Sequence, residues 1–262
     1  MKDFDFAGKT VLVTGASMGI GAVFARELSR RGARLVLVAR SQHKLEELAA
    51  ELPKSVVVVE DLAKPGAAKR VYDAVTAQGL EVDVLINNAG FGMHGPFAEL
   101  ALDVQSDAIA VNVAAVVELT HLFLPTIERR QGGVIQIAST AAYQPVPYMA
   151  VYAASKAFVL SFSEALWAEY RPRGVRVLAL CPGATESGFF ARAGEAAALG
   201  KKAAPEAVVR LGLDAFRANR ASVVHGKANW LTSFISRFAT RAFTAKVGAR
   251  VMKPRAPALT AG

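Results

Sequence analysis

A regular alternation between two kinds of segment constrains the fold of this chain more than any other feature. Six short runs rich in Val, Leu and Ile are separated by stretches of helical length. Strands that are apolar on both faces and separated by helices form parallel sheets covered on both sides. The expected strands are residues 10–14, 34–39, 55–60, 82–87, 133–138 and 175–180, and the expected helices are residues 20–31, 42–52, 65–78, 104–129 and 152–171. We therefore predict an α/β fold, a doubly wound parallel sheet between two helix layers.

Length and composition indicate a single domain over residues 1–262. No linker-like, repeated or low-complexity stretch divides the chain, and 262 residues are enough for one sizeable core. The first residues contain no apolar signal core, and polar residues interrupt every long apolar run, so neither export nor a membrane span is expected. The single cysteine, Cys181, leaves no partner for an intrachain disulfide. We expect a cytoplasmic protein, with peripheral membrane contact as an open alternative.

The segment TGASMGIG, residues 14–21, directly follows one expected strand and directly precedes one expected helix. Gly15 permits a tight turn, Gly19 lets the backbone approach a phosphate, and Gly21 permits close packing of the helix. The N-terminus of a helix also favours the negative charge of a pyrophosphate. This context predicts a dinucleotide site in a Rossmann fold, a three-layer α/β/α sandwich.

The end of the second expected strand indicates which dinucleotide is bound. A carboxylate at this point would bind the ribose hydroxyls and repel a 2′-phosphate. The chain instead has Ala39, followed by Arg40. Because an arginine suits the 2′-phosphate, we predict NADP(H) as the cofactor. The alternative is a solvated arginine that opens the next helix.

With further motifs, the chain resembles the short-chain dehydrogenase/reductase (SDR) family, in its one-domain form that uses NADP(H). The match runs in order and spacing over residues 8 to about 190. It comprises the glycine motif, Asp61-Leu62, the NNAG stretch at 87–90, Pro182-Gly183, and a catalytic tetrad matched by Asn112, Ser139, Tyr152 and Lys156. After about residue 220 the chain departs from the family, because a basic aromatic tail replaces the short final strand.

The resemblance implies roles for single residues and an assembly. It implies a homodimer or homotetramer, and a water anchored by Asn112 that relays protons toward Lys156. The implied cofactor contacts are Gly15, Ser17, Gly19, Ile20, Gly21, Arg40, Asp61, Leu62, Asn88, Ala89, Gly90, Tyr152, Lys156, Pro182, Gly183 and Thr185.

Tyr152 and Lys156 are four residues apart in an expected helix, so their side chains share one face. A phenol has a pKa near 10, and lowering it to about 7 needs roughly 4 kcal/mol. An ammonium about 4 Å away supplies that order of energy. We expect Lys156, helped by the charge of an oxidised nicotinamide, to lower the pKa of Tyr152 and make it a general acid/base. Ser139 would hold the substrate oxygen in line with the hydride donor.

The substrate side is expected to be apolar. Residues 143–149 and 187–190 should border the active site, and both stretches are rich in aromatic and apolar groups. Phe189 and Phe190 could instead pack a lid helix onto the core, and His94 could face solvent. His121 and His225 lack Cys, His or carboxylate partners at metal-site spacing, so no metal is predicted. The candidate substrate contacts are His94, Tyr143, Met149, Phe189 and Phe190.

Residues 220–262 are expected to form a basic amphipathic extension. The chain has a net charge of +9, and the nine cations after Asp214 occur without any acidic residue. We interpret an apolar stripe at helical spacing as a surface that packs on the domain or on a second subunit, with an anionic membrane as the alternative. No nucleic-acid reading motif accompanies the charge, so no nucleic-acid partner is expected. The stripe comprises Trp230, Leu231, Phe234, Ile235, Phe238, Ala242 and Ala245, interrupted by Arg237, Arg241, Lys246 and Arg250.

Together these features predict an NADP(H)-dependent oxidoreductase. It would interconvert a ketone and a secondary alcohol on a lipophilic small molecule, such as a 3-oxoacyl or steroid-like carbonyl. Two alternatives remain open at this point: a cofactor-binding scaffold without turnover, and a membrane-surface docking protein.

Overall fold

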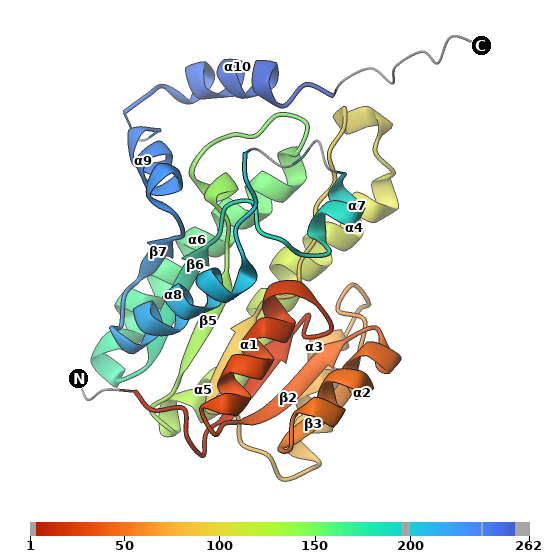
Figure 1. Cartoon of the computed structure of the whole chain (residues 1–262), viewed down its shortest axis with the longest axis vertical. Helices are drawn as coiled ribbons and strands as arrows, with labels where there is room; N and C mark the ends of the chain where they lie inside the picture. Colours follow the sequence, from red (N-terminus) through yellow and green to blue (C-terminus); the bar gives the residue numbers. More distant parts are fainter. Residues whose placement is uncertain (1–3, 195–196, 198–199, 237, 255–262) are drawn as a thin grey trace.

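The computed structural model describes residues 4–194, 197, 200–236 and 238–254. Its centre is a seven-stranded, all-parallel sheet of order β3-β2-β1-β4-β5-β6-β7 (Figure 1). The strand order reverses between β1 and β4, as in doubly wound sheets. The strands are β1 (Thr10–Thr14), β2 (Arg34–Ala39), β3 (Ser55–Val59), β4 (Val84–Asn87), β5 (Gly133–Ile137), β6 (Arg176–Cys181) and β7 (Ser222–Val224).

Helices cover both faces of the sheet, so the predicted three-layer α/β/α fold is confirmed. On one face α1 (Gly19–Arg30), α2 (Gln42–Glu51) and α8 (Pro205–Arg217) bury residues such as Phe24, Leu45 and Phe216. On the other face α3 (Ala67–Thr76), α5 (Ala115–Arg129) and α6 (Ala150–Tyr170) pack against the sheet. The core is therefore apolar on both sides of the strands, as the unbroken apolar runs in the sequence require.

The final strand corrects one expectation. The basic tail was expected to replace it, yet Ser222–Val224 pairs in parallel with β6, with Val223 opposite Leu180. Three half-buried residues at the edge of a sheet give too short an apolar run to stand out in the sequence. The family's sheet is thus complete, and the departure begins only after β7.

The expected helix over residues 104–129 is also interrupted. It consists of α4 (Leu102–Ile109), a π-helical turn η2 (Ala110–Ala114) and α5. Such π turns in α-helices often occur at functional sites. Among the described residues, the whole stretch Leu102–Arg129 is the one helix long and apolar enough to cross a membrane by length and composition, but half of its apolar window is buried in the protein.

Shorter elements surround the carboxyl ends of the strands. They are the 3-10 turns η1 (Phe97–Glu99), η3 (Thr140–Tyr143) and η4 (Arg171–Arg173), the short helix α7 (Phe189–Ala193), and two C-terminal helices, α9 (Lys227–Ile235) and α10 (Arg241–Val251). In Figure 1, α9 and α10 lie at the top of the molecule, at the carboxyl-terminal end of the sheet.

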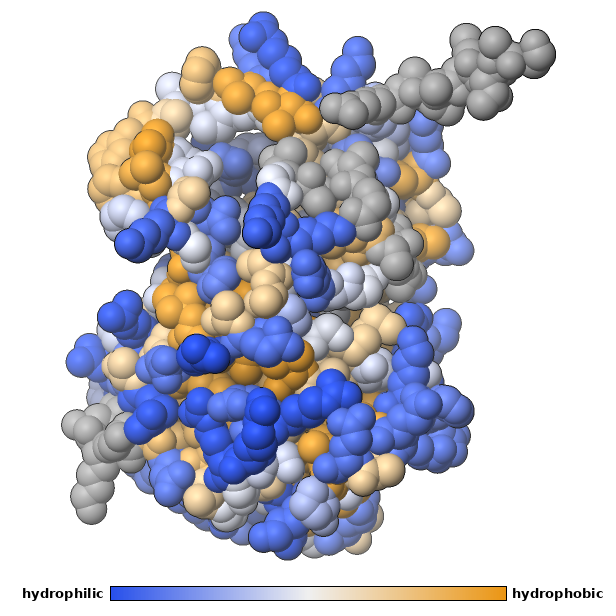
Figure 2. Space-filling view, viewed as in Figure 1, coloured by the Kyte–Doolittle hydropathy of each residue, from blue (hydrophilic) through white to orange (hydrophobic). Residues whose placement is uncertain are grey.

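The tail is helical, as expected, but its apolar stripe does not pack on the domain. Trp230, Ile235 and Phe238 remain 54%, 55% and 78% exposed, and hydrophobic side chains are visible over α9 and α10 in Figure 2. The interpretation that the domain itself covers the stripe is therefore wrong, because α9 and α10 turn other residues inward. Arg237 and Arg255 of the predicted tail lie outside the described residues.

Asp83 ties together the amino-terminal ends of three strands. Its carboxylate accepts hydrogen bonds from Thr10 N at 2.9 Å, Lys9 Nζ at 3.1 Å and Arg130 Nε at 2.8 Å, and its backbone carbonyl accepts from Gly133 N at 3.0 Å. Burial opposes ionisation of this carboxyl, but the hydrogen bonds from Arg130, Thr10 and Lys9 outweigh it and lower the pKa of Asp83. A charged group without solvent contact thus holds β1, β4 and β5 in register.

We predict that Asp83→Asn lowers the free energy of unfolding by about 2–3 kcal/mol at neutral pH, because Lys9 and Arg130 lose the buried carboxylate that pairs with them. Since the folded pKa is depressed, the stabilisation is present above the unfolded pKa of about 3.9 and is lost as the pH falls through the folded pKa. Urea unfolding at several pH values should therefore show the difference from wild type shrinking in acid. The control Asp73→Asn, in an exposed pair with Lys69, should have much less effect; equal effects would contradict the prediction.

Candidate active site

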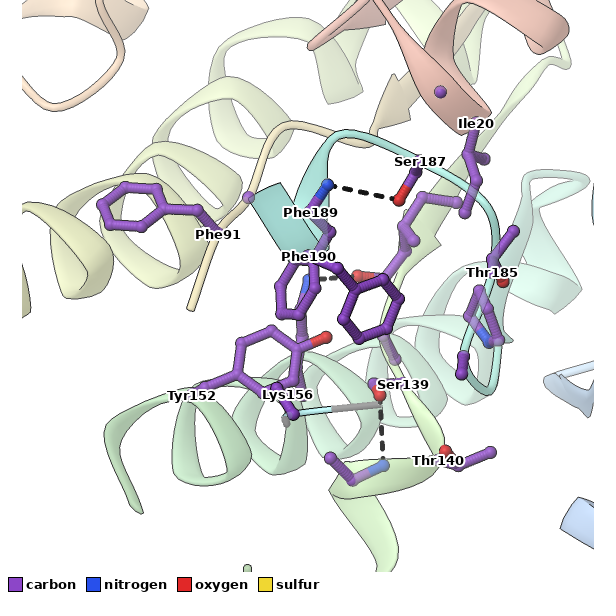
Figure 3. Close-up of a pocket in the computed structure, with 18 of the residues that line it drawn as sticks. Ile20, Phe91, Ser139, Thr140, Tyr152, Lys156, Thr185, Ser187, Phe189 and Phe190 are labelled. Atoms are coloured by element: carbon purple, nitrogen blue, oxygen red, sulfur yellow. Dashed lines mark hydrogen bonds between the residues drawn. The ribbon is translucent and has the colours of Figure 1, made fainter. Parts of the chain in front are cut away.

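The four tetrad candidates come from three elements that meet at the carboxyl-terminal end of the sheet. Ser139 follows β5 and caps η3, where its Oγ accepts from Ala141 N at 3.1 Å. Tyr152 and Lys156 lie on α6 and project toward Ser139 (Figure 3). Asn112 lies in the π-helical turn η2 and is almost fully buried. The structure brings the four candidates to one place, as the sequence predicted.

Backbone groups fix the orientation of Asn112. Its Nδ2 donates to Phe91 O at 2.8 Å and to Ser155 Oγ at 3.1 Å, while its Oδ1 accepts from Phe91 N at 3.1 Å. Gly90 lies beside it: a Cβ there would be 3.0 Å from Asn112 Oδ1 and 3.3 Å from Lys156 Nζ. The amide oxygen and the ammonium therefore lie on either side of the space beside Gly90, which a Cβ at this position would narrow.

Burial governs the electrostatics of Tyr152 and Lys156. Lys156 Nζ lies 5.8 Å from the centre of the Tyr152 ring and donates to Ile137 O at 2.6 Å. Burial raises the pKa of Tyr152, and hydrogen bonding with Ser139 offsets this only in part. Burial also lowers the pKa of Lys156 to about 8. Without nucleotide, desolvation of both groups therefore dominates. The predicted lowering of the Tyr152 pKa by Lys156 also requires the charge of an oxidised nicotinamide, and it stays a prediction.

The glycine motif forms the turn from β1 into α1. Gly15 and Gly19 have φ angles of +63° and +55°, which favour glycine. A Cβ on Gly15 would meet Ala89 Cα and Asn88 Nδ2, both at 2.9 Å. The first turn of α1 contains no acidic residue, and no side chain caps its N-terminus. This end of the helix therefore suits a pyrophosphate.

At the other end of the same groove, Arg40 follows β2 and is exposed. Ser41 and Lys44 of the next turn line the groove beside it. Neither residue was predicted from the sequence, because Arg40 precedes the N-cap Ser41 of α2 and helical spacing therefore does not relate it to Lys44. Three donors, two of them cations, thus surround this end.

One continuous cavity of about 1140 Å³ joins these parts. It runs from Arg40 past Ser139 and Tyr152 to an apolar end formed by η3, α7 and α10. The ring centres of Tyr152 and Phe189 are 5.1 Å apart, and Phe190 packs edge-on against Phe189 (Figure 3). Tyr143, Met149, Phe189 and Phe190 all line the cavity, so four of the five substrate candidates are placed where the sequence predicted.

Three predicted residues do not line it. His94 Nε2 lies 2.7 Å from Met252 O, so this side chain contacts the end of α10 instead of the cavity; its candidacy as a substrate contact is not supported. Gly21 and Asn112 lie one layer deeper. Gly21 packs against Gly15, and Asn112 is hydrogen-bonded to Phe91, and both of these neighbours line the cavity. Every other predicted cofactor contact lines the cavity: Gly15, Ser17, Gly19, Ile20, Arg40, Asp61, Leu62, Asn88, Ala89, Gly90, Tyr152, Lys156, Pro182, Gly183 and Thr185.

The C-terminal helices supply cavity residues that sequence reasoning missed. Asn229 of α9 packs on the Pro182-Gly183 turn, where a Cβ on Gly183 would be 3.0 Å from Asn229 Cγ. Its Nδ2 also donates to His225 O at 2.8 Å. Further contributors, detectable only through the fold, are Thr232, Ser233, Thr244, Val247, Gly248, Val251 and Met252.

Comparison with known proteins identifies the family. The sequence pattern described as short chain dehydrogenase matches residues 9–198. The chain belongs to the short-chain dehydrogenase family. Over 189 residues it is 37% identical to the very-long-chain 3-oxoacyl-CoA reductase of Anas platyrhynchos; the match covers 67% of this chain and 59% of that protein. The chain thus spans less than two thirds of that relative.

Solved structures of this family share the fold closely. A short-chain dehydrogenase from Sphingobium yanoikuyae in complex with NADPH has a TM-score of 0.79 and 30% identity, with 95% of this chain and 99% of that chain covered. A 3-ketoacyl-(acyl-carrier-protein) reductase from Brucella melitensis complexed with NADH has a TM-score of 0.76 and 26% identity, covering 85% of this chain and 99% of that one. Within the described part of the chain, no group of three or more His, Cys, Asp or Glu side chains could hold a metal ion.

We predict that Gly21→Ala weakens binding of a nicotinamide dinucleotide by about tenfold or more, because the new Cβ would meet Gly15 O and Asn88 Nδ2 and push the turn out of shape. A fluorescence titration with NADPH measures the change. Gly79→Ala is the control: Gly79 has a φ of +67°, but its Cβ would meet no atom within 4 Å. The control should lose some thermal stability and keep its affinity, and unchanged affinity in Gly21→Ala would contradict the role of this glycine.

Proposed function

We propose that this protein is an NADP(H)-dependent oxidoreductase that interconverts a ketone and a secondary alcohol on a lipophilic small molecule, with a 3-oxoacyl group as the favoured substrate class. The observation that carries the proposal is the single cavity. Cations line one end, Tyr152 and Ser139 lie between, and aromatic and aliphatic side chains line the other end. This arrangement suits a nucleotide and an apolar carbonyl compound that meet at the tetrad.

The glycine turn and the Arg40 end support NADP(H). Gly15 and Gly19 line the cavity with positive φ angles, and the N-terminus of α1, which no side chain caps, lies at the cavity wall. Arg40, Ser41 and Lys44 offer hydrogen bonds to a 2′-phosphate, and Ala39 carries no carboxylate to repel it. The NADPH in the Sphingobium structure supports the same choice, whereas the Brucella structure with NADH shows that the fold also accepts the other cofactor.

Each tetrad residue has a separate role in the proposed carbonyl reduction. A nicotinamide bound in the groove would supply the hydride that the carbonyl carbon accepts. Tyr152, with a pKa raised by burial, carries its proton at neutral pH and donates it to the carbonyl oxygen. Ser139 hydrogen-bonds the same oxygen and orients it. Lys156 and Asn112, which face the space beside Gly90, return a proton to Tyr152 through water.

The apolar end supports a lipophilic substrate. Tyr143, Met149, Phe189 and Phe190 surround the space next to Tyr152, and Val251 of α10 extends this lining. The reductase from Anas platyrhynchos and the one from Brucella both carry 3-oxoacyl or 3-ketoacyl substrates in their names. We therefore place a 3-oxoacyl chain at this end, with its carbonyl at the tetrad.

A series of 3-oxoacyl thioesters of increasing chain length tests the proposal, with NADPH oxidation followed by absorbance at neutral pH. We expect kcat/KM to rise several-fold for each two methylene groups, because each buried CH₂ contributes about 0.8 kcal/mol. The absence of NADPH oxidation with every ketone, in a protein that still binds NADPH, would favour a cofactor-binding scaffold and overturn the proposal.

We predict that Tyr152→Phe lowers kcat by about 10² to 10⁴, because the proton donor is lost while the nucleotide groove stays intact. The dissociation constant for NADPH should not change. The control Tyr72→Phe makes the same chemical change on α3, where Tyr72 packs on Phe123 outside the cavity, and should keep its activity. A Tyr152→Phe rate above about a tenth of wild type would exclude the role of Tyr152.

We predict that Arg40→Ala raises the KM for NADPH by about tenfold or more, because one charge-assisted hydrogen bond to a phosphate is worth about 1.5–3 kcal/mol. The KM for NADH should stay nearly constant. Arg34→Ala is a matched control, since Arg34 is exposed at the opposite end of β2. Equal changes for both cofactors would contradict the assignment of Arg40 to the 2′-phosphate.

A further inference from the structure

The two C-terminal helices expose a surface that the domain leaves uncovered, which we name the C-terminal apolar face. It is formed by Trp230, Leu231, Phe234, Ile235, Phe238, Phe243, Val247 and Val251, each between 43% and 78% exposed. The rings of Trp230 and Phe234 stack at 5.5 Å, and Phe238 packs edge-on against Phe234. So much exposed apolar surface on a helical pair is typical of an interaction site.

Basic residues, and no acidic ones, lie in the same segment as this face. Lys227, Arg241, Lys246, Arg250 and Lys253 are all exposed, and none forms an ion pair within the described residues. The whole sequence after Asp214 contains no Asp or Glu. Figure 2 shows hydrophilic side chains beside the hydrophobic ones along α10. A helix with an apolar face bordered by Lys and Arg matches the chemistry of an anionic lipid surface.

The face continues into the cavity. Val247 and Val251 are 43% and 57% exposed, yet both also line the cavity, together with Gly248 and Met252 of the same segment. Gly248 lies against the loop before α6, where a Cβ would be 3.0 Å from Pro147 Cδ, and the contact of His94 with Met252 O fixes the end of the helix. α10 therefore covers the apolar end of the cavity, and the side of α10 that faces away from the cavity is exposed to solvent.

We propose that the C-terminal apolar face binds an anionic phospholipid membrane and sets the apolar mouth of the cavity against the bilayer. A lipophilic ketone then passes from the lipid along Val247 and Val251 to Tyr152. This second step rests on the proposed function, whereas the docking itself does not. The polar nucleotide end at Arg40, at the other end of the cavity, stays open to water.

Charge decides between a membrane and a second copy of this chain. A symmetric dimer through this face would bring Arg241, Lys246 and Arg250 of one copy toward the same residues of the other, and like charges repel. Residues 1–214 hold 22 basic and 22 acidic residues, so the rest of the chain offers no net negative charge to an asymmetric contact. An anionic bilayer supplies both the apolar interior and the negative surface that the face requires.

Co-sedimentation of the full-length protein with vesicles tests the docking without substrate or turnover. We expect binding to vesicles that contain phosphatidylglycerol, much weaker binding to pure phosphatidylcholine, and loss of most binding when salt is raised from about 0.05 M to about 0.5 M, because the Debye length shortens. Equal binding to both vesicle types, or none to either, would overturn the proposal.

Two pairs of variants assign the binding to this face. Arg241→Gln/Lys246→Gln should weaken vesicle binding by about fivefold or more, whereas Arg34→Gln/Lys54→Gln, which removes the same two charges from exposed positions elsewhere, should weaken it much less. Ile235→Ser should weaken binding and Ile109→Ser should not, although these two isoleucines are 55% and 50% exposed on helices. Equal losses within either pair would overturn the assignment.

The same variants distinguish the other occupant and the other proposal. If Ile235→Ser instead converts a dimer into a monomer in sedimentation velocity and leaves vesicle binding unchanged, a second copy occupies the face and the membrane proposal fails. Reduction of a short soluble ketone by NADPH in vesicle-free buffer reports the proposed function separately, and Ile235→Ser should leave that rate unchanged. Docking and catalysis can therefore fail independently.

Discussion

The parallel pairing of seven strands is the constraint on which everything else in this protein depends. Because all strands run the same way, their carboxyl ends meet at one edge of the sheet. The strand order reverses between β1 and β4, so the loops after these two strands separate and leave a crevice. Asp83 holds the opposite ends of β1, β4 and β5 together, which keeps these three strands in register.

Backbone groups of the sheet and its loops position the chemical groups in that crevice. Ile137 O accepts from Lys156 Nζ, Phe91 binds both ends of the Asn112 amide, and Pro182 O accepts from Thr140 N next to Ser139. Main-chain partners of this kind move little, so they orient side chains more firmly than exposed side-chain partners would. The cost is desolvation, which raises the pKa of Tyr152 and lowers that of Lys156. Tyr152 is thereby kept protonated, as the proposed reduction requires.

The C-terminal helices link this chemistry to the outer surface. Asn229 packs on the turn after β6, Gly248 packs on the loop before α6, and Met252 is buried beside His94. These contacts turn one side of α9 and α10 into a cavity wall and leave the other side, including Phe238 and Phe243, in contact with solvent. One short segment therefore forms both a cavity wall and an exposed apolar surface.

The sequence alone was sufficient for the layer architecture and the glycine turn, because these depend on local periodicity and on residue types at fixed spacing. The resemblance to the family supplied the four tetrad candidates, and the structure brings them to one place, while their catalytic roles stay predictions. Spacing along α6 also brought Tyr152 and Lys156 to one face. Contacts between distant segments were not predictable in this way. His94 meets Met252 across 158 residues, β7 is too short to register as a strand, and the π turn at Asn112 has no marker in an apolar run. The sign of the Tyr152 pKa shift and the exposure of the tail depend on burial, and burial is decided only when tertiary packing determines which side chains lose contact with water.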